Sequence, residues 1–266
     1  METARLKNII ILTLALVNVF LLGTLGMRRA QQIASQHQAA EALIAIFAAD
    51  QVSLSESAIS FDSPPSALTL ERETAREQAL AAAFLGNSLT SANEGGGIVT
   101  YTSDSGQAVF RASGAFEITG DLGENAALLC QQFCRDYGCE PPETWFAPLG
   151  SGSVTAQQLY QGYTVENAAV TFVAENDVLR SVSGILLPAE SAPAQSGALL
   201  SASSALTAFL NARRTSGTVV SSVTAAYLCY ELQNNAAIMT LTPTWCIVTD
   251  TVNYYVNCST GAVTHA

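Results

Sequence analysis

The protein has 266 residues, carries a formal net charge of −11, and contains only 12% charged residues. This balance argues against a nucleic-acid-binding protein, because phosphate backbones require a basic surface. It also argues against a body that lies on anionic lipid. The length suffices for one large domain or two small ones.

An uncharged stretch, Ile9–Gly26, lies near the N-terminus between basic residues at positions 5, 7, 28 and 29. As a helix it has roughly the length of a bilayer core. We therefore expect a transmembrane helix with a cytoplasmic stub before it and an extracytoplasmic body after it, in a single-pass protein of the cell membrane. The alternative is a cleaved signal peptide. The stretch is longer than a usual signal h-region, and no A-x-A site follows it, which favours a retained anchor.

Asn18 stands in the middle of this stretch. An amide at the centre of a bilayer is unfavourable unless it finds a hydrogen-bond partner, and polar residues at such depth tend to face a neighbouring helix. We expect Asn18 to contact a partner helix. The alternative is a hydrogen bond within its own helix.

Beyond the apolar stretch, Arg28–Phe47 continues at helical spacing and a Ser-rich connector runs to Pro65. Thr69 is the expected N-cap of a helix that Gly86 ends. The predicted domains are a stub at 1–8, a transmembrane helix at 9–26, a juxtamembrane helix and connector at 27–65, a first α+β lobe at 66–188 and a C-terminal lobe at 198–266.

Within the lobes, a helix followed by a run of alternating strands recurs near 70–120, 124–187 and 200–265. Gly95–Gly97 is interpreted as a flexible joint, and the segment 188–197 as a linker. The strand pattern of 157–174 breaks at Glu166-Asn167. We predict an α+β fold, in which antiparallel sheets with helices packed on one face form pseudo-repeats after the membrane helix.

Six cysteines suggest disulfides in an extracytoplasmic body. A helix over Asn125–Tyr137 with Gly138 at its left-handed C-terminus brings Cys139 against Cys134, the preferred local pair. The alternative is that all six are buried free thiols. Zinc would need four ligands at paired spacing, and the two histidines lie far away in sequence, so we expect no metal.

The C-terminal strands 244–249 and 253–258 predict a hairpin. A register centred on Val252 places Cys246 opposite Cys258, where a cross-strand disulfide would fit. A slip of one residue removes this pairing.

The sequence contains no recognisable catalytic constellation. His37 belongs to the predicted stalk and His265 is penultimate, so neither is placed for a triad. HExxH, G-x-S-x-G and Walker motifs do not occur. We expect no enzyme and no cofactor. A wall hydrolase that uses only carboxylates stays open as an alternative, because any two acids can converge in a fold.

Three stretches resemble a known family. PTWCIVTDTVNYYVNCSTGAV is similar to the pattern P-x-W-x-I-x-T-D…Y-Y-V-(D/N)-x-x-T-G-x-V of PepSY-like domains and of the C-terminus of YycI. YQGYTVENAAVTFVAENDVLRSVSG resembles a strand pair of the same proteins. ALVNVFLL resembles the L-x-N-x-F-L-L run of the YycI membrane helix.

The resemblance to the YycH/YycI family implies regulation through protein contacts. The expected partners are a sensor histidine kinase that controls cell-wall metabolism and a YycH-like companion, contacted largely through membrane helices. Phe20 and Leu21 follow Asn18 in the matching run and are expected to share its contact. The alternative is a PepSY-like inhibitory or chaperone module for a secreted peptidase.

Overall fold

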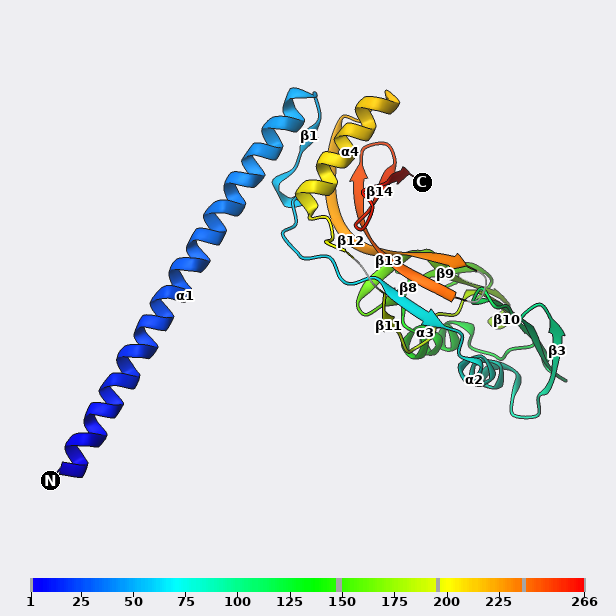
Figure 1. The fold of residues 1–266 in the computed structure, drawn as a ribbon. Coiled ribbons are helices and arrows are strands. Elements are labelled where there is room, and N and C mark those ends of the chain that lie inside the picture. Colours follow the sequence, from blue (N-terminus) through cyan, green and yellow to red (C-terminus); the bar gives the residue numbers. More distant parts are fainter. Residues whose placement is uncertain (1, 147–149, 195–196, 236–237, 266) are drawn as a thin grey trace.

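The computed structural model describes residues 2–146, 150–194, 197–235 and 238–265, with side chains from Leu16 onward apart from those at 19, 25, 26, 28, 30, 32, 33 and 235 (Figure 1). The helices are α1 (Glu2–Ala49), the 3-10 turn η1 (Glu56–Ala58), α2 (Thr74–Leu85), α3 (Ala126–Tyr137) and α4 (Ala202–Ser216). The strands are β1 (Ser53–Leu54), β2 (Leu68–Glu71), β3 (Thr90–Gly95), β4 (Ile98–Ser103), β5 (Gly106–Phe110), β6 (Ala115–Gly120), β7 (Cys139–Glu140), β8 (Gly152–Tyr160), β9 (Tyr163–Glu175), β10 (Val178–Ile185), β11 (Ala192–Pro193), β12 (Ser222–Asn235), β13 (Ile238–Thr249), β14 (Asn253–Asn257) and β15 (Val263–His265).

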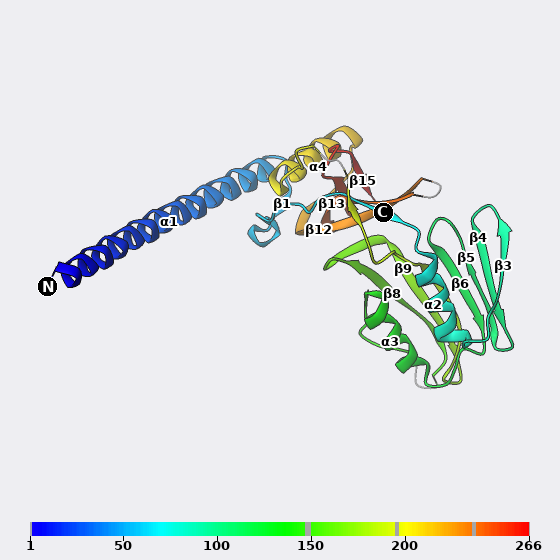
Figure 2. The same cartoon turned by 60° about the horizontal axis from the view of Figure 1, so that its bottom comes forward.

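Helix α1 extends from the body as a long arm, and only its last turns pack against the rest of the chain (Figures 1 and 2). Ala40, Leu43 and Phe47 are buried there at helical spacing. The ring of Phe47 stacks on Phe209 of α4, with 6.3 Å between the ring centroids. The helical stalk predicted from residue 28 to 47 is thus the C-terminal part of α1.

The predicted transmembrane helix at 9–26 is wrong for the part of the chain that the structure describes. None of the helices formed by the described residues combines the length and the apolarity needed to cross a membrane. The side chains of residues 9–15 lie outside the described part.

The prediction of repeated antiparallel sheets is also wrong. Among the described residues, fifteen strands form one connected and mixed sheet, in which β12 runs parallel to both β1 and β9. Both partners are distant from β12 in sequence, and α4 separates β12 from β9. This is the arrangement in which parallel pairing arises, because parallel strands need a long crossover between them.

The main path of the sheet is β11-β2-β13-β12-β9-β10-β6-β5-β4-β3. One core lies where α2 and α3 cover β4 to β10, on the side seen in Figure 2. A second core joins the end of α1 and α4 to β13 and β14. A smaller third cluster around Leu70, Val165, Tyr230 and Leu241 lies between them. The helices are therefore divided between separate cores.

Helix α2 begins later than predicted. Residues 68–71, which include the expected N-cap Thr69, form β2 and pair antiparallel with Ile238–Leu241 of β13. Leu68 and Leu70 are buried and their neighbours less so, which is the period of a strand. The predicted end is confirmed, since Gly86 is the C-cap of α2.

Strand β13 begins before the strand predicted at 244–249 and continues through Pro243. On one side Pro243 lies opposite Tyr230 of β12. On the other side, β2 pairs with residues up to 241 and β14 pairs with residues from 244 onward. Pro243 therefore stands in the gap between two neighbours, where the missing N–H removes no ladder hydrogen bond.

Candidate functional site

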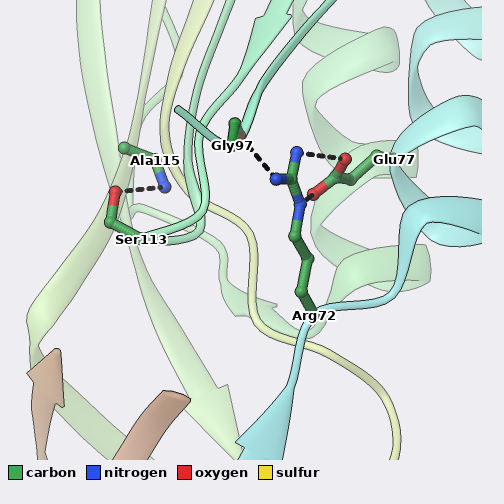
Figure 3. Close-up of polar contacts among 5 residues, drawn as sticks. All are labelled: Arg72, Glu77, Gly97, Ser113 and Ala115. Carbon is green, nitrogen blue, oxygen red and sulfur yellow. Dashed lines mark hydrogen bonds and ion pairs between the residues drawn. The ribbon is translucent and has the colours of Figure 1, made fainter. Parts of the chain in front are cut away.

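A buried ion pair joins β2 and α2 to the β3–β4 hairpin (Figure 3). Arg72 Nε lies 2.6 Å from Glu77 Oε1, and Arg72 Nη2 donates to Glu77 Oε2 at 2.9 Å. The side chains are only 17% and 5% exposed, respectively. This bidentate geometry is the strongest form of such a pair. The guanidinium is held inside the fold by these bonds, so the ion pair has a structural role. We call the Arg72–Glu77 ion pair the Arg72 joint.

The same guanidinium also donates from Nη1 to the carbonyl of Gly97, as Figure 3 shows. Gly97 has a φ of +80°, and a Cβ at this position would lie 2.7 Å from the Cβ of Ala112. Only glycine fits such a backbone at that approach. The Gly95–Gly97 run, interpreted from sequence as a flexible joint, forms the turn of the β3–β4 hairpin and is held by Arg72.

A pocket of about 480 Å³ adjoins this joint. Its lining comprises Thr69, Glu71, Arg72, Glu73, Pro188, Glu190, Ser191 and Ala192. Glu73 Oε2 accepts a hydrogen bond from the backbone N–H of Ala189 at 3.2 Å. The charge of Arg72 is already neutralised by Glu77, so the remaining charged residues of the lining are acidic. The residues that line this pocket include no nucleophile paired with a general base.

A second cluster brings one carboxylate between two phenols. The hydroxyl of Tyr227 in β12 donates to Glu166 Oε1 at 3.3 Å, and that of Tyr255 in β14 donates to Glu166 Oε2 at 3.2 Å. The thiol of Cys246 in β13 is fully buried and lies within interaction distance of both hydroxyls. We call Glu166, Tyr227, Tyr255 and Cys246 the Glu166 cluster.

The strand register explains why these side chains meet. Cys246 lies directly opposite Tyr227 on one neighbouring strand and opposite Tyr255 on the other. Residues that lie opposite each other point to the same face of a sheet, so three adjacent strands present the two phenols and the thiol together. Glu166 reaches them from β9, next to Val165, which pairs with Tyr230 of β12.

Asn167 holds the backbone beside Glu166. Its Nδ2 donates to the carbonyl of Leu232 and its Oδ1 accepts from the N–H of Leu232, both at 2.7 Å. The side-chain amide thereby replaces a pair of ladder hydrogen bonds where β9 meets β12. The break in strand pattern at Glu166-Asn167 was the only signal of this cluster in the sequence, and it did not reveal the partners.

Burial raises the pKa of Tyr227 and of Tyr255, and the negative charge of Glu166 raises both further. Burial also raises the pKa of Cys246 to about 11, although polar interaction with the two phenol groups acts in the opposite direction. At neutral pH these groups are therefore protonated donors. A thiol held in this state is a poor nucleophile, because the thiolate is the reactive form.

The predicted Cys134–Cys139 pair is brought together by the structure. Helix α3 ends at Tyr137, and Gly138 takes the left-handed conformation, as expected from the sequence. All six cysteines are buried free thiols in the structure. A hydrogen bond from Cys139 lowers the pKa of Cys134. A disulfide between these two residues stays a prediction.

The predicted register of the C-terminal hairpin is wrong. Cys246 lies opposite Tyr255, whereas Cys258 is buried with Trp245 in the core on the other face. The register differs from the prediction by three residues, and an odd shift reverses the face of every side chain on the strand. Cys246 and Cys258 are therefore not positioned for a disulfide.

The predicted contact residues Asn18, Phe20 and Leu21 are exposed on α1, the helix that extends from the body as an arm (Figure 1). Phe20 is 67% and Leu21 is 50% exposed. His37 of the same helix lies 3.4 Å from Glu56 at the surface, and His265 stacks on Tyr254. Within the described ranges, no three His, Cys, Asp or Glu side chains converge as metal ligands.

No protein family and no curated protein matches this sequence. Among solved structures, the chain is similar to the crystal structure of an uncharacterized protein from Eubacterium rectale ATCC 33656. The identity is 10%, the match covers 80% of this chain and 85% of that one, and the TM-score is 0.40. Function therefore has to follow from the residues themselves.

Proposed function

We propose that the protein is a regulator that acts through protein contacts on the extracytoplasmic side of the cell membrane. By its resemblance to YycI-like proteins, its target is a sensor histidine kinase that controls cell-wall metabolism, with a YycH-like companion. The observation that carries the proposal is the exposed apolar surface of α1. This surface consists of Leu16, Val17, Phe20, Leu21, Leu22 and Met27.

An exposed apolar surface of this extent marks a contact site, because isolated soluble proteins rarely leave such patches uncovered. Asn18 lies within it and is exposed as well. An amide surrounded by apolar side chains gives a helix contact both orientation and specificity. We therefore propose that this surface packs against a helix of the partner.

The C-terminal end of α1 connects the proposed contact surface to the rest of the protein. Asp50 follows α1 directly, and its Oδ2 lies 2.5 Å from Nη2 of Arg214 in α4. Together with the stacking of Phe47 on Phe209, this contact fixes α1 to α4. A partner that moves α1 would thereby move α4 and the strands beneath it.

The test is a bacterial two-hybrid assay between the full chain and the cell-wall sensor kinase of the same organism. We expect Asn18→Leu to weaken association, by about 0.5–1.5 kcal/mol if one interhelical hydrogen bond is lost. Thr24→Leu is the matched control, because the Thr24 hydroxyl already donates to the carbonyl of Leu21 in its own helix. That variant should associate as the unmodified chain does.

Equal association of the two variants would contradict the proposal. So would co-purification with a secreted peptidase in place of the kinase, which is the result expected of a PepSY-like inhibitor.

A further inference from the structure

We propose that Glu166, Tyr227 and Tyr255 form a receptor for an arginine side chain of a partner protein. This inference rests on the proposed function and gives that function a second contact, on the sheet. It requires that the carboxylate be accessible, that its charge be uncompensated and that the surrounding groups suit a guanidinium.

The carboxylate is accessible. Glu166 and Tyr255 are half-buried, and Tyr227 is 40% exposed. The two phenols approach different oxygens of Glu166 from strands on either side of β13, while the buried thiol of Cys246 closes the base. A carboxylate oxygen has two acceptor sites, so each oxygen keeps one for an incoming donor.

Within the part of the chain that the structure describes, no ion pair compensates the charge of Glu166. The ion pairs among the described residues use Glu56, Glu77, Asp121 and Asp50 as their acids. Glu166 has two neutral donors instead. Its charge contributes to the raised pKa of both phenols and of the Cys229 and Cys246 thiols around it, after the larger effect of burial. A cation bound here would relieve all four interactions.

The surroundings suit a guanidinium. Its planar fork donates to both oxygens of a carboxylate, and its face stacks on aromatic rings, so a carboxylate with a ring on each side matches both properties. The protein is strongly acidic, with 22 Asp and Glu against 11 Lys and Arg, and this charge favours a basic partner.

The test uses N-acetyl-arginine amide as the probe and the full chain as the receptor. Tyrosine ring signals are followed by NMR during titration. We expect saturable shifts of the Tyr227 and Tyr255 signals, with a dissociation constant on the order of millimolar. In Glu166→Gln the affinity should fall about tenfold, since the charge-assisted hydrogen bonds are lost. Glu175→Gln, an exposed carboxylate at the end of the same strand, should bind as the unmodified chain does.

Two probes keep the test independent of whether Glu166→Gln folds. N-acetyl-norleucine amide has the apolar stem without the charge and should not shift the ring signals. N-acetyl-lysine amide should bind more weakly than the arginine probe, because a point charge lacks the fork. Equal binding of the norleucine and arginine probes, equal affinity of Glu166→Gln and the unmodified chain, or no saturable shift would overturn the receptor.

Failure here can be told apart from failure of the proposed function, because this titration needs no kinase. If the arginine probe does not bind while Asn18→Leu still weakens kinase association, the receptor is wrong and the proposed function stands. If the probe binds while Asn18→Leu has no effect, the receptor stands and the α1 contact is wrong.

Discussion

Glu77 and Glu166 are both partly or fully covered carboxylates on the sheet-rich body, but their partners differ. Glu77 is 5% exposed on its side chain and receives two hydrogen bonds from a permanent cation, Arg72. Glu166 is half-buried and receives its hydrogen bonds from two neutral phenols. The first carboxylate is satisfied inside the fold, whereas the second still carries a net charge at the surface. The partner of a carboxylate therefore distinguishes the structural ion pair of Glu77 from the carboxylate of Glu166, for which we propose a binding role.

The largest expected effect comes from breaking the Arg72 joint. Arg72→Met leaves Glu77 buried without its cation, so we expect a loss of about 3–5 kcal/mol in the free energy of unfolding. Urea denaturation measures this loss. Arg180→Met is the control, because its ion pair with Asp121 is exposed at 3.6 Å and should be worth less than about 1 kcal/mol.

The double variant Arg72→Met/Glu77→Met sharpens the same point. Removing both charges should restore much of the stability, since the penalty belongs to the unpaired carboxylate. A double variant that is no more stable than Arg72→Met alone would show that the joint depends on the Gly97 contact instead.

As the pH rises, the Glu166 cluster should lose its contribution to stability at a lower pH than the Arg72 joint does. Burial raises the pKa of Cys246 to about 11, and polar interaction with the two neighbouring phenol groups opposes that rise. A raised pKa in the folded state stabilises the protein below the unfolded value, near 8.5 for cysteine, and this contribution is lost as the pH rises toward 11. We therefore expect the free energy of unfolding to decline from about pH 9 upward. Cys246→Ala should reduce that decline, and an unchanged pH profile would contradict this assignment.

Removing the charge of Glu166 should change the pKa of Tyr255 more clearly than the free energy of unfolding. Glu166→Gln keeps hydrogen-bond acceptance from one phenol, so we expect a loss of only about 1 kcal/mol. The pKa of Tyr255 should fall, because burial and then the charge of Glu166 hold it up. Absorbance of ionised tyrosine against pH measures this. An unchanged pKa of Tyr255 in this variant would contradict the contribution of the Glu166 charge to that pKa.

The smallest expected effect is at the end of α3. Cys139→Ala removes the hydrogen bond that lowers the pKa of Cys134, so the Cys134 pKa should rise and its alkylation should slow. Treatment with oxidised glutathione should remove two hydrogen atoms from the peptide that contains both cysteines, as mass spectrometry would show. Cys130→Ala should leave this result intact, and a disulfide that requires Cys130 would contradict the predicted pairing.

Local features of the fold were predictable from the sequence. The end of α3 at Gly138, the end of α2 at Gly86 and the proximity of Cys134 to Cys139 follow from spacing and from the conformations that glycine permits. The strands around residues 98–120 follow from alternation and turn residues. Each of these features depends on residues only a few positions apart.

Only the tertiary structure decided the sheet and the Glu166 cluster. Residues 68–71 became a strand because β13 supplied a partner, and β12 runs parallel to β9 because α4 lies between them. Glu166 and Tyr255 are separated by 89 residues, and the hairpin register that places Cys246 under Tyr255 differs from the predicted one by an odd number of residues. Alternation within one strand determines which residues share a face. The strand that covers that face, and the residue that lies opposite, are set by packing of the whole chain.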